Sequence, residues 1–210
     1  LVGQITVDDV VHIIQEEAGE DVLLLSGAGD GDVNEPIRDS YVSRVRWLVA
    51  NLLTALLGAT IISSFGGAIE KLVALAALSP MVASIGGNAG TQTMAVAVRA
   101  LATNQLTRAN TRRILWRELR VAMLNGGTVA TLIGLATALV FASPLLGAVI
   151  GAAVLTNIVT AGLAGVLVPV TLDRMGQDPA VASSVFVTMI TDSMGFFAFL
   201  GLAVASGLVG

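Results

Sequence analysis

The sequence predicts an all-α integral membrane protein in which five helices of each chain cross the bilayer. Hydrophobic residues make up 55% of the 210 residues and charged residues only 12%, with a mean hydropathy of +0.85, a profile that no ordinary soluble domain shows. The charge is segregated, because ten of the fifteen acidic residues lie within the first forty. After them, apolar segments recur at about the 20-residue length that a helix needs to cross the hydrocarbon.

The first forty residues are soluble in character and come before the predicted spans. The stretch LVGQITVDDVVH, residues 1–12, opens with the alternating pattern of a strand. An acidic helical run follows it and ends in the turn-rich segment GAGDGDVNEP. We therefore expect residues 13–40 to form an acidic helix and a linker, and residues 41–210 to form the membrane domain.

Five apolar segments qualify as membrane spans: residues 47–66, 80–101, 121–142, 145–172 and 179–208. Pro80 and Pro179 stand where the first turn of a helix tolerates proline, since the N–H that proline lacks has no partner there. Asp178 is a candidate cap for the last span. The small-residue spacing GAVIG, residues 147–151, is suited to close helix packing and gives no indication of a site.

The basic residues predict how the chain is oriented in a cell (plasma) membrane. Loops on the cytoplasmic side retain arginine and lysine. Three arginines precede the first span, one follows the fourth, and six surround the loop between the second and third, whereas Lys71 alone lies on the other side. This distribution predicts a cytoplasmic N-terminus and an external C-terminus. Contact with anionic lipid headgroups explains the arginine cluster, so no nucleic-acid partner is expected.

The second span carries polar residues that a membrane helix normally avoids. In GGNAGTQTMAVAVRALA, residues 86–102, Asn88 lies eleven residues before Arg99, which places it near the bilayer centre at about 1.5 Å per residue. The three-and-four spacing of one helix face joins Ser84, Asn88, Thr91, Gln92 and Ala95. Two interpretations stay open for this span: polar and small residues that hold helices together, including the pair Gly86 and Gly87, or the wall of a polar path.

The last span favours the polar path, because Asp192 is the only carboxylate deep inside a predicted span. It lies fourteen residues after Asp178, which corresponds to about 21 Å along a helix. An ionised carboxylate at that depth costs about 2.5 to 3.5 kcal/mol, so we expect it to face water, a partner charge or a transported cation. The alternative is a neutral Asp192 that only forms hydrogen bonds with its neighbours. Its helix face also holds Ser184, Thr188, Thr191 and Gly195.

The polar groups point to a hard cation. The chain has no cysteine and a single histidine, His12, so thiolate and imidazole sites are excluded in practice. Carboxylate, hydroxyl, amide and carbonyl oxygens suit hard divalent ions such as Mg²⁺, Ca²⁺ or Mn²⁺, and they do not select one of the three. One acid per chain is few for a divalent ion, but a twofold homodimer places two Asp192 carboxylates at one axis.

Two motifs resemble the MgtE family of magnesium channels: GGNAGTQTMAVAVRALA, and FVTMITDSMGFFAFLGLA, which includes Asp192. The resemblance covers essentially the whole chain. It implies a homodimer of ten helices, with a pore between the second and fifth spans of both chains and Asp192 as the ion-binding position. Gly87, Asn88 and Gly90 match the family signature. The expected pore-lining set is Gly86, Gly87, Asn88, Gly90, Thr91, Gln92, Thr188, Thr191 and Gly195.

The N-terminal segment fits the same resemblance. Residues 1–12 resemble the end of a cystathionine-β-synthase-type (CBS) domain, and the helix after them carries EEAGED. In the family this acidic helix binds regulatory Mg²⁺, and the matching positions here are Asp9, Glu17, Glu20 and Asp21. The alternative is a solvated acidic helix face. Most of the cytoplasmic sensor is absent from this chain, so we expect conduction without the normal feedback.

These observations predict a passive magnesium channel rather than an enzyme. The membrane potential favours entry of a doubly charged ion by roughly 4.6 kcal/mol per 100 mV, and the sequence contains no P-loop nucleotide-binding motif. Two alternatives stay open. The first is a proton- or sodium-coupled secondary transporter of divalent cations, and the second is a membrane anchor or receptor, which leaves the polar faces around Asn88 and Asp192 without an explanation.

Overall fold

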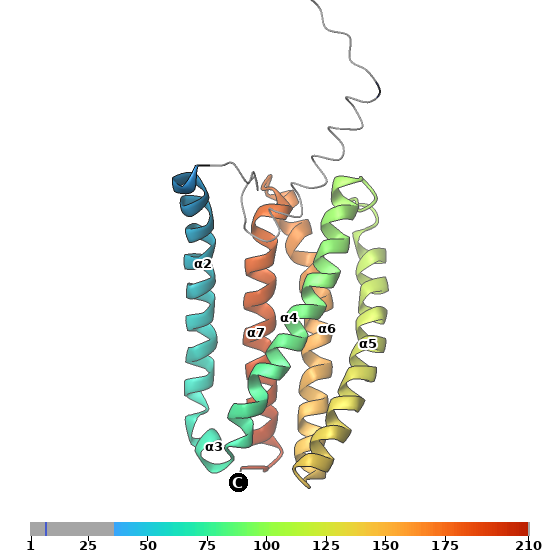
Figure 1. Cartoon of the computed structure of the whole chain (residues 1–210). Helices are drawn as coiled ribbons and strands as arrows, with labels where there is room; N and C mark the ends of the chain where they lie inside the picture. The colour runs from blue at the N-terminus through green and yellow to red at the C-terminus, as the bar shows by residue number, and fades with distance from the viewer. Residues whose placement is uncertain (1–6, 8–35, 210) are drawn as a thin grey trace, which may run out of the picture.

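The structure, a computed structural model, describes residue 7 and residues 36–209, and over these residues its only regular secondary structure is helix (Figure 1). This confirms the predicted all-α class for the described part. The helices, in chain order, are α2 (Ile37–Ser64), α3 (Gly66–Lys71), α4 (Ala74–Ala102), α5 (Thr111–Val140), α6 (Pro144–Arg174) and α7 (Pro179–Ala205). The predicted CBS-like end and nearly all of the acidic segment lie outside the described residues, as do Asp9, Glu17, Glu20 and Asp21.

Four of the described helices are long and apolar enough to cross a membrane: α2, α5, α6 and α7. The second predicted span lies in α4, which is not one of the four although it has 29 residues. Its glycines, Asn88 and Gln92 lower its hydropathy. The structure thus supports a multi-pass helical membrane protein with four strongly apolar helices and a fifth long helix, α4, of mixed character that runs through the same bundle (Figure 1).

The helix boundaries differ from the predicted spans where basic residues flank them. Both α2 and α5 begin ten residues before the spans predicted at residues 47 and 121. A helix does not have to end where the hydrocarbon ends, because arginines in its first turns are solvated outside the membrane. For the same reason residues 37–40, assigned from the sequence to the linker, form the first turn of α2.

The prediction for Pro80 is wrong, whereas the prediction for the start of α7 is confirmed. Pro80 lies inside α4, six residues after its first residue, Ala74. The N–H that Pro80 lacks would have donated to the Ala76 carbonyl oxygen, and a membrane bundle tolerates such a gap when other groups satisfy the local backbone. The Ser79 hydroxyl donates to the neighbouring carbonyl oxygen, that of Leu75, at 2.6 Å. At the start of α7, Pro179 occupies the first turn and the Asp178 carboxylate accepts from the Ala180 N–H at 2.8 Å.

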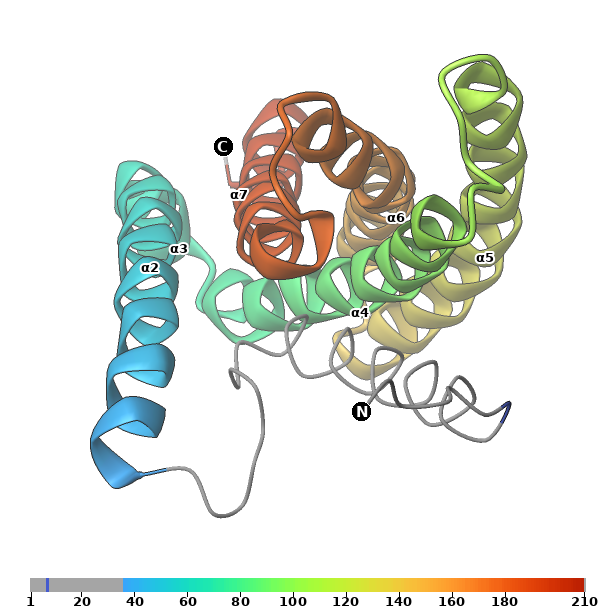
Figure 2. The ribbon, with the colours of Figure 1, turned by 90° about the horizontal axis from the view of Figure 1, so that it is seen from above.

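Helix α6 is the centre of the bundle, and 61% of its most apolar 18-residue segment is buried. Seen from above, α5 lies on one side of α6 and α7 lies on the other (Figure 2). Helix α4 packs across α6 and α7. Helix α2 lies at the edge and packs on α7. The interior is formed by apolar side chains of α4, α6 and α7, among them Val82, Ile150, Val154 and Phe199.

Helices α5 and α6 are held together by small residues. A Cβ atom built on Gly134 would lie 2.9 Å from the Gly147 carbonyl oxygen, and one on Gly151 would lie 3.1 Å from the Ala130 carbonyl oxygen. Distances this short require that the two backbones touch, which small residues permit in membrane helices. The packing role predicted for residues 147–151 is therefore confirmed.

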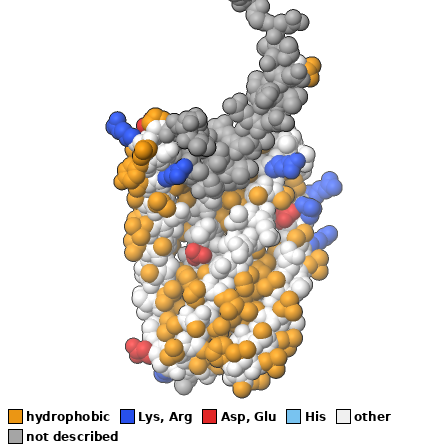
Figure 3. Space-filling model, viewed as in Figure 1, with side chains coloured by type: hydrophobic (Ala, Val, Ile, Leu, Met, Phe, Trp, Pro, Cys, Tyr) orange, Lys and Arg blue, Asp and Glu red, His pale blue; other side chains and the backbone are white. Residues whose placement is uncertain are grey.

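The charged residues mark the ends of the bundle. The start of α2, the end of α4 and the start of α5 lie at the same end, together with the end of α6 (Figure 1). Figure 3 shows basic side chains gathered at this end above a largely hydrophobic surface. At the opposite end the Lys71 ammonium group donates to the Val209 carbonyl oxygen at 3.0 Å.

Candidate ion-conduction site

Asp192 stands at the centre of α7, with thirteen residues of the helix on each side. Its side chain is half-buried, and within the described part of the chain it makes no ion pair or hydrogen bond. No group of three or more histidine or acidic side chains that could hold a metal occurs among the described residues. One chain therefore offers a single carboxylate at mid-helix, too few protein oxygens to enclose a divalent ion.

The structure divides the polar face predicted for α7 into two rows. Thr191 and Gly195 are buried between α7 and its neighbours, and the Thr191 hydroxyl donates to the Thr188 carbonyl oxygen at 3.1 Å. The second row, Ser184, Thr188 and Asp192, recurs every four residues and is half-buried. Only this second row is partly open to the surroundings of the single chain.

The polar stripe predicted on α4 is exposed along its whole length. Asn88 is the central residue of this helix, with fourteen residues on each side. The structure leaves every member of the predicted face exposed: Ser84, Asn88, Thr91, Gln92 and Ala95. Only some of their polar groups have a hydrogen-bond partner within the helix: the Thr91 hydroxyl donates to the Gly87 carbonyl oxygen at 2.9 Å. An exposed central amide in a membrane bundle needs water or another polar surface beside it.

Glycines let α4 approach α7 beside these two rows. A Cβ atom on Gly90 would lie 2.7 Å from Val187 Cγ1 and 3.3 Å from Thr191 Cγ2. One turn earlier, a Cβ atom on Gly87 would lie 3.9 Å from the Thr191 hydroxyl oxygen. Since Asn88 follows Gly87 and Asp192 follows Thr191, the contact brings the central segments of both helices to the same level.

Gly86 and Gly195, both expected to line the pore, are buried against a residue that sequence analysis overlooked. Asn157 of α6 is fully buried, and Cβ atoms built on Gly86 and on Gly195 would both overlap its side chain. Within one chain these two glycines therefore serve helix contact. Asn157 could have been identified from the sequence, because it is an amide in the middle of the most hydrophobic of the candidate spans.

Helix α2 adds two polar residues that were also overlooked. A Cβ atom on Gly58 would lie 3.1 Å from Phe196, which is one helical turn beyond Asp192 on α7. Asn51 and Thr54 precede Gly58 by seven and four residues, so they share its side of α2. Because α2 and α7 run in the same direction (Figure 1), this side of α2 faces the row that contains Thr188 and Asp192.

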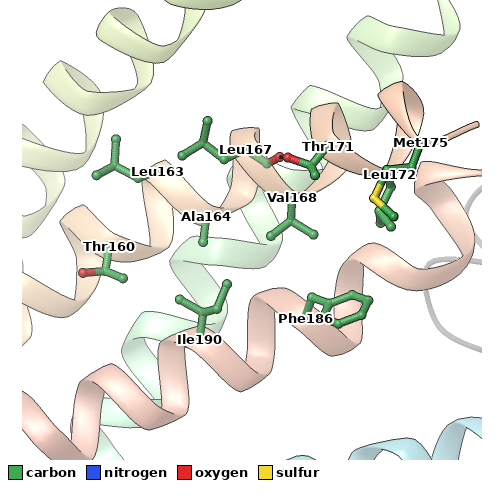
Figure 4. A pocket seen from close by; sticks show the side chains of 10 residues that line it. All are labelled: Thr160, Leu163, Ala164, Leu167, Val168, Thr171, Leu172, Met175, Phe186 and Ile190. Atoms are coloured by element: carbon green, nitrogen blue, oxygen red, sulfur yellow. Dashed lines mark hydrogen bonds between the residues drawn. The ribbon is translucent and has the colours of Figure 1, made fainter. Parts of the chain in front are cut away.

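A hollow on another side of α7 is a different feature. It is a groove of about 500 Å³ between α6 and α7, and its lining is shown in Figure 4. Phe186 and Ile190 line it from α7, and each lies two residues from a member of the Asp192 row, which places the groove on the opposite side of the helix. The hydroxyls of Thr160 and Thr171 donate to carbonyls of their own helix. The groove is therefore apolar and unsuited to a cation.

Gln92 borders a smaller and more polar space of about 90 Å³ between α4, α5 and α6. Asn125 of α5 and Thr93 line the same space. The structure thus places Gln92 beside a space that α5 and α6 also line, whereas Gly87 and Gly90 meet α7. Of the predicted set, Gly87, Gly90 and Thr191 lie at the contact between α4 and α7. Asn88, Thr91, Thr188 and Asp192 lie beside them along the two helices and are at least partly exposed.

A helical membrane bundle with an unpaired carboxylate at the middle of one helix and an exposed amide at the middle of its neighbour is typical of membrane transport proteins, in which such residues mark the path of an ion or substrate. The particular family follows from comparison with known proteins. Residues 79–202 match the family model MgtE, described as a divalent cation transporter, so the match covers more than half of the chain. The chain belongs to the MgtE family, which is a family of transporters and not of enzymes.

Three curated relatives support this assignment, and each is named magnesium transporter MgtE. The chain is 31% identical to the protein of Bacillus subtilis over 98% of its own length, 33% identical to that of Enterococcus faecalis over 97%, and 34% identical to that of Thermus thermophilus over 97%. These alignments cover 45–46% of the relatives. The chain therefore spans a little less than half the length of the curated relatives that it matches.

Proposed function

We propose that this chain forms the pore of a magnesium-selective channel, through which Mg²⁺ moves down its electrochemical gradient. The observation that carries the proposal is the half-buried Asp192 at the centre of α7, which has no partner among the described residues. A carboxylate in that position is costly unless water or a cation reaches it. The names of the three curated relatives favour magnesium as that cation.

The proposed pore lies between two copies of the chain. One carboxylate and a few hydroxyl and amide groups are too few to replace the water around Mg²⁺, which sheds its water reluctantly. A twofold axis beside α4 doubles the carboxylates and turns the exposed stripe of α4 inward. Asn88 and Asp192 of both chains then contact a largely hydrated ion, with Thr188 adding a hydroxyl at the rim.

The proposed orientation has the basic end of the bundle in the cytoplasm of a plasma membrane. The inside-negative potential then draws Mg²⁺ from the Lys71 end toward the arginine-rich end. We also propose feedback by cytoplasmic Mg²⁺ on this pore. For that role we propose the acidic segment with Asp9, Glu17, Glu20 and Asp21, whose carboxylates a divalent ion bridges in one conformational state of the sensor.

The test is Mg²⁺ flux into liposomes that contain the native chain or the Asp192→Asn variant. This change keeps the size of the side chain and removes its charge, so we expect flux to fall at least about tenfold while the dimer persists. Asp178→Asn is the matched control: it removes one charge from the same helix, and asparagine caps a helix start as well as aspartate does. Its flux should stay close to the native level.

Two results would contradict the proposal. The first is native flux through the Asp192→Asn variant, because the carboxylate then has no part in conduction. The second is a reversal potential that follows the pH or Na⁺ gradient instead of the Mg²⁺ equilibrium potential. That outcome identifies a coupled secondary transporter in which Asp192 exchanges its cation for a proton or for sodium.

A further inference from the structure

Asn157 is the fully buried polar residue at which α4, α6 and α7 meet. It belongs to α6, which contributes none of the expected pore-lining residues. Its Nδ2 donates to the Val82 carbonyl oxygen of α4 at 2.9 Å, while its Oδ1 has no partner within the described part of the chain. A buried carbonyl oxygen without a partner opposes stability, so the hydrogen bonding of this amide does not by itself explain its presence.

Two glycines of different helices enclose the Asn157 side chain. A Cβ atom on Gly86 of α4 would overlap it, and the three nearest atoms all belong to Asn157. On the side of α7, a Cβ atom on Gly195 would lie 2.7 Å from Asn157 Nδ2, but also 3.1 Å from Ala83 Cα and 3.2 Å from Ala83 N. The side chain of Asn157 therefore lies between α4 and α7, and each helix has no side chain where it meets the amide.

We propose that Asn157 is a positioning residue for the pore, and that its amide sets the approach of α4 to α7 and so the level of Asn88 relative to Asp192. The inference deepens the proposed function. It rests on contacts that differ between the two glycines: the three atoms nearest to a Cβ on Gly86 all belong to the Asn157 side chain, whereas those nearest to a Cβ on Gly195 include two backbone atoms of Ala83 in α4. This difference allows a test by compensating substitutions.

Five variants separate positioning from general packing. Gly86→Ala forces the new methyl group into the Asn157 side chain, and we expect Mg²⁺ flux to fall about tenfold. Asn157→Ala removes the three atoms that lie nearest to this methyl group, so the pair Gly86→Ala with Asn157→Ala should conduct as well as Asn157→Ala alone. Gly195→Ala should also lose flux. Its pair with Asn157→Ala should not recover, because the Ala83 backbone remains in place.

A second measurement reports the helix contact without transport. The chain has no cysteine, and a Cβ atom on Gly87 would lie 3.9 Å from the Thr191 hydroxyl oxygen. We therefore expect Gly87→Cys with Thr191→Cys to form a disulfide between α4 and α7. In this background Gly86→Ala should slow disulfide formation, and adding Asn157→Ala should return it to the rate measured with Asn157→Ala alone. Adding Asn157→Ala to Gly195→Ala should leave the rate slow.

The inference is overturned if Gly86→Ala keeps native flux and native disulfide formation, or if Asn157→Ala rescues both glycine variants to the same degree or rescues neither. Equal rescue identifies a general gain of space, and a lack of rescue identifies damage elsewhere. Failure of the proposed function has a different signature, since the native chain then carries no Mg²⁺ while the disulfide measurements still show rescue of Gly86→Ala alone.

Discussion

Asn88 and Asp192 are the central residues of α4 and α7, and the residues that precede them, Gly87 and Thr191, face each other where the two helices meet. Asn88 is exposed and Asp192 is half-buried. An amide and a carboxylate thus stand at the middle of two neighbouring helices on the side that the single chain leaves open. A membrane offers no hydrogen bonds at that depth, so this side requires water or a second chain.

The amide of Asn88 is expected to contribute to conduction without contributing to folding. We predict that Asn88→Ala lowers the maximal Mg²⁺ flux several-fold, because the exposed amide no longer contacts the water around the ion. Thermal unfolding in detergent should not change, since Asn88 makes no hydrogen bond through its side chain with the described residues. Leu132→Ala, on the exposed surface of α5, is the control and should leave both measurements unchanged.

The proposed twofold axis beside α4 can be tested by cross-linking. Because the chain has no cysteine, Asn88→Cys introduces a single thiol at the centre of α4. We predict that a short bifunctional thiol reagent joins two chains through this residue in membranes. Leu132→Cys is the matched control, and it should give monomers. Dimers from Leu132→Cys without dimers from Asn88→Cys would place the interface on α5.

The contact between α5 and α6 is expected to be sensitive to a single methyl group. We predict that Gly147→Ala destabilises the protein by about 1 to 3 kcal/mol, because the new Cβ would overlap the Gly134 carbonyl oxygen and Ala138. Gly127→Ala, on α5, is the control, since a Cβ atom there meets nothing within 4 Å. Thermal unfolding in detergent should show a lower midpoint for Gly147→Ala than for Gly127→Ala.

At the start of α7, the stabilisation that comes from the hydrogen bond of Asp178 can be separated from the stabilisation that comes from its negative charge. Asp178→Ala removes the acceptor of the Ala180 N–H and should cost about 1 kcal/mol of stability. Asp178→Asn keeps an acceptor at the same place, so its unfolding midpoint should match that of the native chain. Equal losses in the two variants would show that the negative charge, rather than the hydrogen bond, stabilises the start of α7.

Much of this architecture follows from the sequence alone. Apolar length predicts the helices, and the pair Asp178 and Pro179 marks the start of α7, because a cap and a first-turn proline act within one helical turn. Periodicity also predicts the exposed face of α4, since residues spaced by three and four share a side whatever the fold. The N-terminal position of Pro80 was predicted wrongly because the apolar pattern does not show where α4 begins.

The surroundings of each face were decided only by the tertiary structure. Sequence spacing places Thr191, Asp192 and Gly195 on one face of α7, but the packing of α4 and α6 buries Thr191 and Gly195 and leaves Asp192 half-exposed. In the same way, the need for glycine at position 86 comes from Asn157, which is 71 residues away in the chain and lies against it in the fold. Local patterns encode which residues share a side of a helix, whereas the neighbour that covers that side depends on how distant helices cross.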